Sequence, residues 1–223
     1  EGSFAAFEEL VEKEGLFPEK GHKIWFNSFR DGEMNINTTK IVGKDATDGE
    51  QMTEAEIEAR EQVVKIHQFL KKYVPGFENS HLISTPVQVG VRETRRVTGD
   101  YVLTEADVVE GRKFPDVIAR GAYPIDIHDK DRWEVRFVKD GGAYDIPYRC
   151  ITPKRLNNLL TAGRCISTTH IAHGSTRVMA VAMAIGQGAG CAAALALNRS
   201  NNIRAVEPGE LKKTLIAQGA NLG

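Results

Sequence analysis

The sequence has few cysteines and almost no net charge. Three of its 223 residues are cysteine, an odd number that argues against a disulfide framework. Its 29 Lys and Arg residues nearly balance its 30 Asp and Glu residues, so the formal net charge of -1 indicates neither a nucleic acid nor an anionic membrane as partner. No basic segment followed by an apolar run opens the chain, and we therefore expect no signal peptide.

The overall composition is that of an ordinary folded domain. Hydrophobic residues make up 41% and charged residues 26% of the chain, which argues against a disordered or fibrous protein. The length fits one large domain or two small ones. Because the composition shifts after Pro153, we expect a boundary there, with domains at residues 1–152 and 153–223. We expect a soluble protein, and the sequence leaves open whether its compartment is the cytoplasm or the periplasm.

The first half of the chain contains two predicted helices and a predicted strand. Residues 4–14 form one amphipathic pattern, and residues 35–42 have the composition of a strand. A capping-box pattern at Thr53 indicates the start of a longer helix, whose apolar stripe continues to Tyr73 before Pro75 and Gly76 end it. This stripe predicts a helix face in a hydrophobic core.

From residue 81 the pattern becomes typical of β structure. Residues 82–89, 96–103, 133–138 and 143–149 are rich in β-branched and aromatic side chains, and residues 104–111 between them indicate a short helix. These elements predict an α+β domain, in which one or two helices pack on a mixed or antiparallel sheet.

The last part of the chain predicts a strand, a polar loop and two helices. Residues 158–162 have the character of a buried strand, residues 165–176 that of a loop, and residues 207–218 that of a terminal helix. Residues 178–197 contain no charged side chain, and this uncharged segment is long enough for a transmembrane span. They include eight Ala and three Gly, however, which add little transfer free energy. We therefore favour a helix buried in a soluble domain, with no membrane contact.

The start of this long helix is a candidate ligand site. The N–H groups at a helix N-terminus favour an anion such as a phosphate. Arg164 and Arg177 flank this end, the Ser175 hydroxyl or its neighbour is expected to cap it, and the amides near Val178 and Met179 would then face a ligand. A capped helix packed tightly on a sheet explains the same residues equally well.

Other groups of polar residues give weaker signals. Residues 92–96 are rich in arginine, and in an extended segment Arg92 and Arg96 would share one face while Arg95 points to the other. Such a cluster either binds an anionic group or is simply solvated. The histidines at 128, 170 and 173 lack further ligands at a familiar spacing, so we expect no metal site and regard them as possible proton donors or acceptors. The glycines at 186–190 do not fit the dinucleotide fingerprint, because their spacing differs and they lie inside a helix.

One long segment resembles a known family. Residues 157–197, NNLLTAGRCISTTHIAHGSTRVMAVAMAIGQGAGCAAALAL, resemble the C-terminal flavin-binding segment of the FAD-dependent oxidoreductase family, which belongs to the glutathione-reductase-like flavoproteins. Shorter blocks also match in order along nearly the whole chain: Asn37-Thr38-Thr39, Pro75-Gly76-Phe77-Glu78-Asn79, Gly90-Val91-Arg92-Glu93-Thr94-Arg95-Arg96, Tyr101-Val102-Leu103-Thr104, Phe114-Pro115-Asp116, Tyr123-Pro124-Ile125-Asp126-Ile127-His128 and Ile146-Pro147-Tyr148-Arg149.

The resemblance also has a gap. Members of the family begin with a Rossmann unit whose glycine-rich turn holds the diphosphate of FAD, and these 223 residues contain no such turn. The resemblance therefore implies the C-terminal part of an oxidoreductase: a substrate-side domain followed by the last strand and helix of the α/β FAD-binding domain. We expect this part to be inactive alone and not to retain FAD. The helix face that would meet the missing Rossmann domain should be exposed and favour self-association.

The resemblance assigns two groups of site residues. The residues implied to lie beside the flavin are Gly163, Arg164, Ser175, Arg177, Val178 and Met179. The candidates for the substrate side are Arg92 and Arg95 for binding a small-molecule or carbohydrate substrate, and His128, Arg149, His170 and His173 for catalysis. One of these would hold an anionic or hydroxylated substrate, and another would move a proton. The alternatives are a carbohydrate-active lyase, since relatives are sometimes labelled xanthan lyase, and a non-catalytic binding module.

Overall fold

The chain forms two compact units. The computed structural model describes residues 2–3, 7–17, 23–128, 133–199 and 201–223. Among these, the first unit extends to Val91, and the second comprises Arg92–His128 and Trp133–Gly223. Both combine helices with small antiparallel sheets, which confirms the α+β prediction. The domain boundary predicted after residue 152 lies inside the second unit, and it stays a prediction about a longer protein.

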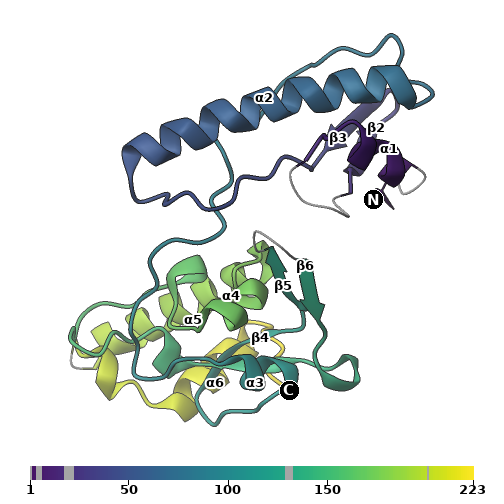
Figure 1. Cartoon of the computed structure of the whole chain (residues 1–223). Helices are drawn as coiled ribbons and strands as arrows, with labels where there is room; N and C mark the ends of the chain where they lie inside the picture. Colours follow the sequence, from purple (N-terminus) through teal and green to yellow (C-terminus); the bar gives the residue numbers. More distant parts are fainter. Residues whose placement is uncertain (1, 4–6, 18–22, 129–132, 200) are drawn as a thin grey trace. The chain divides into compact units, whose positions relative to one another are not determined.

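The first unit packs two helices with a three-stranded sheet (Figure 1). Its strands β1 (Gly2–Ser3), β2 (Trp25–Arg30) and β3 (Glu33–Ile36) are antiparallel in the order β1-β2-β3. The helix α1 (Glu8–Lys13) lies within the predicted residues 4–14. The predicted strand at 35–42 is only partly right, because β3 ends at Ile36 and the following backbone leaves the ladder.

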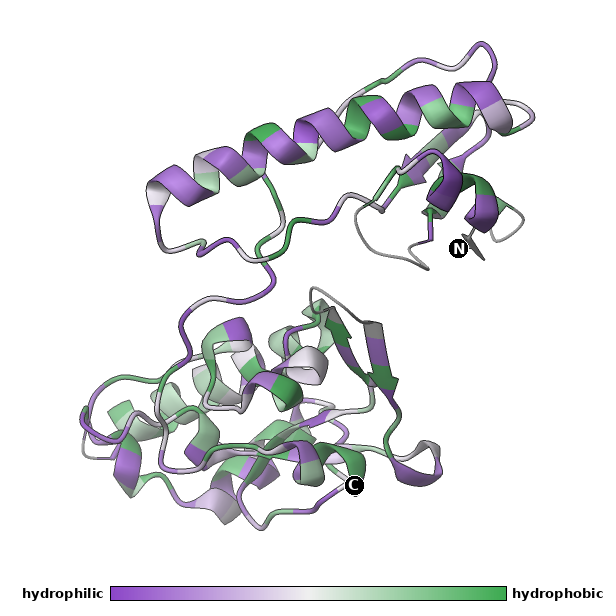
Figure 2. Ribbon diagram, in the orientation of Figure 1, coloured by the Kyte–Doolittle hydropathy of each residue, from purple (hydrophilic) through white to green (hydrophobic). Residues whose placement is uncertain are grey.

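The long helix α2 (Gly49–Tyr73) contributes Ile66, Phe69 and Leu70 to the hydrophobic core of this unit. Asp48 caps it by accepting from the amides of Glu50 and Gln51, so the predicted start at Thr53 is wrong by one turn. The predicted core face is confirmed, because α2 buries a stripe of residues on one side, and Figure 2 shows polar residues alternating with this stripe. The buried residues are Ala55, Ala59, Gln62, Ile66, Phe69 and Leu70.

The second unit contains two two-stranded antiparallel sheets covered by helices (Figure 1). One sheet pairs β4 (Val117–Gly121) with β7 (Tyr144–Pro147), and the other pairs β5 (Ile125–His128) with β6 (Trp133–Arg136). The helices are α3 (Glu105–Val109), α4 (His170–Thr176), α5 (Met179–Leu197) and α6 (Pro208–Ala217), with short 3-10 turns at Lys139–Gly141, Tyr148–Cys150, Gly163–Cys165 and Ile203–Ala205. The predictions of α3, α6, β6 and β7 are confirmed.

Three predicted strands, at 82–89, 96–103 and 158–162, do not form. In the second of these, the backbone hydrogen bonds go to loops instead: the amide of Val97 donates to the carbonyl of Cys165, and that of Leu103 to the carbonyl of Ser167. These bonds satisfy the backbone without a continuous ladder. Residues 158–162, predicted as a buried strand, form a loop whose side chains are mostly exposed. The strands β4 and β5 were not predicted.

The start of the long C-terminal helix also differs from the prediction. Residues 170–176, expected in a loop, form α4, which the Thr169 hydroxyl caps by accepting from the amide of Ala172. Helix α5 begins only at Met179, with Val178 as its N-cap. Ser175 therefore lies buried inside α4, and the prediction that it caps the long helix is wrong.

Helix α5 buries one face and exposes the other. Its buried face packs on β4, where a Cβ atom added to Gly188 would lie 2.9 Å from Cβ of Ile118. On the opposite face Met179 is 83% and Met183 75% exposed. The expectation of a buried helix therefore holds for one face of α5, and the other face is exposed, as the resemblance implied for a chain without the Rossmann domain. Figure 2 shows the helix as largely hydrophobic. By length and composition alone, α5 is the one helix among the described residues that could cross a membrane.

Candidate functional site

The candidate site in the second unit lies along one face of α4. His170, Gly174 and Arg177 follow one another at four- and three-residue steps, so they share this face. Gly174 brings the helix onto β5: a Cβ atom added there would lie 3.0 Å from the backbone oxygen of Asp126 and 2.7 Å from Cδ1 of Ile127. This close approach places the Arg177 end of α4 beside β5, where its guanidinium contacts Asp126.

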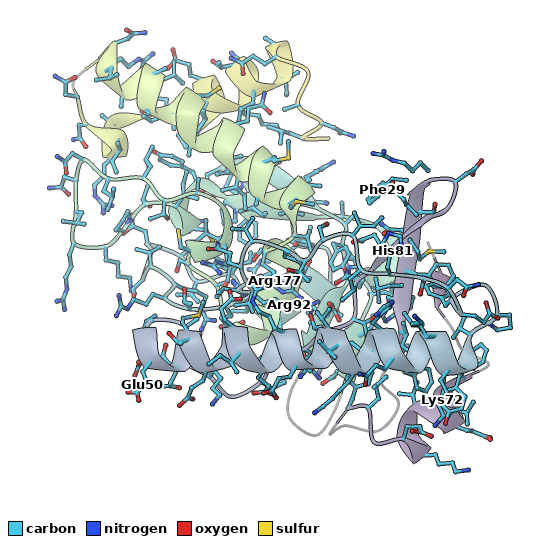
Figure 3. The ribbon with its side chains drawn as sticks, turned by 90° about the horizontal axis from the view of Figure 1, so that it is seen from above. Phe29, Glu50, Lys72, His81, Arg92 and Arg177 are labelled. Atoms are coloured by element: carbon cyan, nitrogen blue, oxygen red, sulfur yellow. The ribbon has the colours of Figure 1, made fainter. Side chains whose placement is uncertain are left out.

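Two arginines share one carboxylate at the Arg177 end. The Asp126 oxygen Oδ2 lies 3.1 Å from Nη2 of Arg177 and 3.4 Å from Nη1 of Arg92. Arg177 also donates to the backbone oxygen of Asp126 at 3.2 Å. The side chain of Arg177 is 14% exposed and that of Arg92 52% exposed, and Figure 3 shows the two arginines close together. The predicted substrate-side Arg92 and the predicted flavin-side Arg177 therefore belong to one cluster.

Burial and the neighbouring Arg92 both disfavour the charged form of Arg177. Burial lowers the pKa of Arg177, and the nearby charge of Arg92 lowers it further, whereas Asp126 and Tyr123 raise it. Placing two like charges together in a partly buried position costs free energy. Groups under this kind of electrostatic strain occur often at ligand sites.

A glutamate organises the other end of α4. Oε2 of Glu93 lies 2.7 Å from Nδ1 of His170, while Oε1 pairs with Arg96. Because an ionised carboxylate only accepts hydrogen bonds, Nδ1 of His170 carries the hydrogen, and Nε2 of the neutral ring is left as a proton acceptor. The His170 side chain is 49% exposed. It is therefore both oriented and accessible, as a proton-transferring residue must be.

His173, one turn further along, has a different environment. Its side chain is buried, and Nε2 donates to the backbone oxygen of Arg164 at 3.0 Å. Burial lowers the pKa of His173 to about 4, and the charges of Arg96 and Arg177 also lower it. His173 is therefore neutral near pH 7 and ties α4 to the turn Gly163–Cys165.

Ser175 is held in a buried chain of hydrogen bonds. The Tyr144 hydroxyl donates to Oγ of Ser175, and Oγ donates to the backbone oxygen of Tyr123, both at 2.6 Å. Burial raises the pKa of Tyr144 to about 12, which keeps its phenol protonated as the donor. These two hydrogen bonds hold α4 against the segment that follows β4. The Ser175 hydroxyl therefore uses both its donor and an acceptor position within the protein.

The predicted flavin-side residues at the start of α5 lie beside the turn at Gly163. Gly163 has a φ of +74°, and a Cβ atom there would lie 3.6 Å from Cβ of Ala182 in the first turn of α5. No side chain caps α5, because Val178 occupies the N-cap position. The first amides of α5, around the exposed Met179, therefore remain without a side-chain acceptor. Glycine here allows the left-handed backbone that brings the turn against the helix.

The remaining predicted residues lie outside this cluster. Arg149 forms a two-point ion pair with Asp116, at 2.9 and 3.1 Å, and lies over the Tyr101 ring. Arg95 is exposed and forms no ion pair with the described residues. His128 ends β5, but its side chain lies outside the part of the structure that is described.

Two acidic residues of the cluster were not predicted as site residues. Glu93 and Asp126 stand beside predicted arginines and histidines in the sequence, and this adjacency is the only signal that could have indicated them. Across the described ranges, no group of three or more His, Cys, Asp and Glu residues is arranged to hold a metal ion.

The comparison with protein families identifies the chain. The family model described as FAD dependent oxidoreductase matches residues 4–215. The chain belongs to the FAD-dependent oxidoreductase family. This match confirms the resemblance of the sequence blocks and supports oxidoreductase chemistry with FAD. No curated protein and no solved structure matches the chain.

Proposed function

We propose that this chain supplies the substrate side and the flavin-ring side of an FAD-dependent oxidoreductase. The observation that carries the proposal is the juxtaposition of Gly163 with the uncapped first turn of α5, inside a chain that matches the family over residues 4–215. A further nucleotide-binding unit, outside these 223 residues, would hold the diphosphate end of FAD. The present chain alone is then inactive and does not retain the cofactor.

The residues at the start of α5 fit one edge of a flavin. The free amides there, near Val178 and Met179, combine with the positive end of the helix dipole to favour negative charge. When bound, FAD would supply the capacity to accept a hydride from the substrate. The turn at Gly163 lies against the first turn of α5, and Arg164 adds a positive charge on the same turn.

The polar side chains along α4, which are His170 with Glu93 and Arg177 with Arg92, fit the substrate side of the same reaction. Nε2 of His170 would take a proton from a substrate hydroxyl, while Glu93 holds the ring in position through Nδ1. Arg92 and Arg177 would bind the substrate beside it. His173 would act through position alone, because it is buried and bonded to Arg164.

An absorbance spectrum from about 300 to 550 nm tests the proposal, measured on this chain and on a version extended through a glycine-rich nucleotide-binding unit. We expect flavin bands in the extended protein only. In the extended protein, Met179→Glu should lower flavin affinity by about tenfold or more, because a carboxylate would compete for the amides of α5. Ile216→Glu, on the exposed side of α6, adds the same charge and is the control.

Two outcomes would contradict this placement. Flavin bands of equal intensity in the Met179→Glu variant would remove the start of α5 from the flavin site, since a glutamate there stabilises the helix itself and does not unfold it. Flavin in neither protein would refute the proposed cofactor. Cleavage of a uronate polymer without flavin would then favour the lyase interpretation, and a lack of any activity would favour the binding module.

The exposed face of α5 should drive self-association of the isolated chain. Met179 and Met183 lie on this face, and contiguous exposed apolar surface commonly recruits a partner. We propose that the nucleotide-binding unit covers this face in the longer protein and a second copy covers it here. Sedimentation should detect a dimer that Met183→Glu weakens at least fivefold, whereas Ile216→Glu leaves it intact. A monomer over a wide concentration range would contradict this prediction.

A further inference from the structure

Among the described residues, two guanidinium groups share the single carboxylate of Asp126. Arg92 and Arg177 both contact one carboxylate, and Asp126 is the only carboxylate that either guanidinium contacts among the described residues. The three side chains together therefore carry a charge of about +1 at neutral pH. Within a partly buried cluster, such an excess favours binding of an anion.

The arginines also have unused hydrogen-bond donors. Each guanidinium has five N–H groups, and the contacts with Asp126 use only Nη1 of Arg92 and Nη2 of Arg177. The other nitrogens of these two side chains form no hydrogen bond with described residues. The Arg92 side chain is half-exposed, and no nitrogen of Arg177 is buried without a partner. These nitrogens therefore reach the surface and are available to a planar oxyanion, which arginine binds through two parallel hydrogen bonds.

The size of the excess charge selects the type of anion. A carboxylate carries one negative charge and would neutralise the cluster. A phosphate monoester carries about -1.5 to -2 at pH 7 and would leave it with a net negative charge in a partly buried place.

We infer that Arg92 and Arg177 form a binding site for the carboxylate group of a small organic acid, and that Asp126 competes with this ligand for the two guanidinium groups. The inference deepens the proposed function, since it rests on that function for the statement that the acid is the substrate. It specifies a substrate class, hydroxylated carboxylic acids, whose hydroxyl would reach His170.

Titration of the full 223-residue chain with sodium acetate and with sodium D-glucuronate, at constant ionic strength, tests the site without any flavin. Arginine side-chain NMR signals report binding at the guanidinium groups. We expect both acids to bind saturably. Their affinity should fall about tenfold in Arg92→Gln and in Arg177→Gln. Arg155→Gln, which removes an exposed arginine of the same unit, should bind as tightly as the unchanged chain.

The Asp126→Asn variant separates this inference from general charge attraction. If Asp126 competes with the ligand, its neutralisation should tighten acetate binding about threefold or more, because two donors are released and the local charge rises. Weaker acetate binding in Asp126→Asn, or tighter binding of inorganic phosphate than of acetate to the unchanged chain, would overturn the inference. Because Arg177 is partly buried, circular dichroism confirms folding of each variant, and the half-exposed Arg92 keeps the test informative if Arg177→Gln unfolds. Failure here would leave the flavin spectra of the extended protein unaffected.

Discussion

At the scale of single residues, two histidines of α4 show how the environment separates chemical roles. His170 and His173 lie three residues apart, yet the His170 side chain is 49% exposed and that of His173 is 2% exposed. Oε2 of Glu93 lies 2.7 Å from Nδ1 of His170 and 4.0 Å from Nδ1 of His173. The exposed ring is suited to proton transfer with a substrate, and the buried ring to holding the turn at Arg164.

The buried His173 predicts acid sensitivity of the fold. Burial lowers its pKa from 6.5 to about 4, so between these values the unfolded chain binds a proton that the native chain does not. The free energy of unfolding therefore rises with pH through this window, and acidification from pH 6.5 to 4 should remove about 3 kcal/mol. Urea unfolding at pH 7 and pH 4.5 measures the effect.

The control for this prediction is the neighbouring histidine. His173→Gln keeps a donor for the Arg164 carbonyl but does not titrate, so its stability should depend much less on pH. His170→Gln makes the same change at an exposed position and should keep the pH dependence of the unchanged chain. An equal loss of stability on acidification in His173→Gln and the unchanged chain would show that His173 is not its source.

At the scale of elements, the site depends on how closely α4 approaches β5. Replacing Gly174 by Ala places a methyl group 3.0 Å from the oxygen and 3.2 Å from the nitrogen of the Asp126 backbone. Backbone atoms cannot move aside independently, so Gly174→Ala should lower the free energy of unfolding by about 1–3 kcal/mol. Gly186→Ala is the matched control within α5, where a Cβ atom would meet nothing within 4 Å.

The two glycine variants should change stability in opposite directions. Gly186→Ala should raise it by about 0.5–1 kcal/mol, because alanine favours the helical backbone. Urea denaturation of both variants at pH 7 measures the difference. Equal stability of Gly174→Ala and the unchanged chain would mean that α4 and β5 are packed less closely than the site requires.

At the scale of the whole molecule, the chain is organised as two units with separate hydrophobic cores. The first core contains Ile66, Phe69 and Leu70 of α2, and the second contains Ile118 and Ile185 of β4 and α5. Since each unit has its own core, we expect two transitions in differential scanning calorimetry.

Substitutions in each unit assign these transitions. In the first unit, the Gln62 amide accepts from the nitrogen and donates to the oxygen of the Lys40 backbone, both at 2.9 Å. Gln62→Ala removes both of these hydrogen bonds and should lower one transition by several degrees. Gly174→Ala should lower only the other transition. A single transition that both variants shift would show that the units unfold together.

The sequence alone determined features that depend on neighbouring residues. The apolar spacing indicated the core face of α2, the pattern of residues 104–111 indicated α3, and the blocks of residues 157–197 indicated the family. Helix periodicity involves residues within one or two turns, so it is visible in the sequence. The sequence also placed Arg92, His170 and Arg177 among the candidate site residues, although it could not group them.

Only the tertiary structure decided which of these residues meet. Asp126 joins Arg92, 34 residues before it, with Arg177, 51 residues after it, and the turn at Gly163 meets α5 only after the chain has folded. The strands predicted at 96–103 and 158–162 failed for the same reason, because their backbone partners are set by distant segments rather than by local preference. Burial, charge pairing and the pKa of His173 all depend on such long-range contacts, which no local pattern of residues encodes.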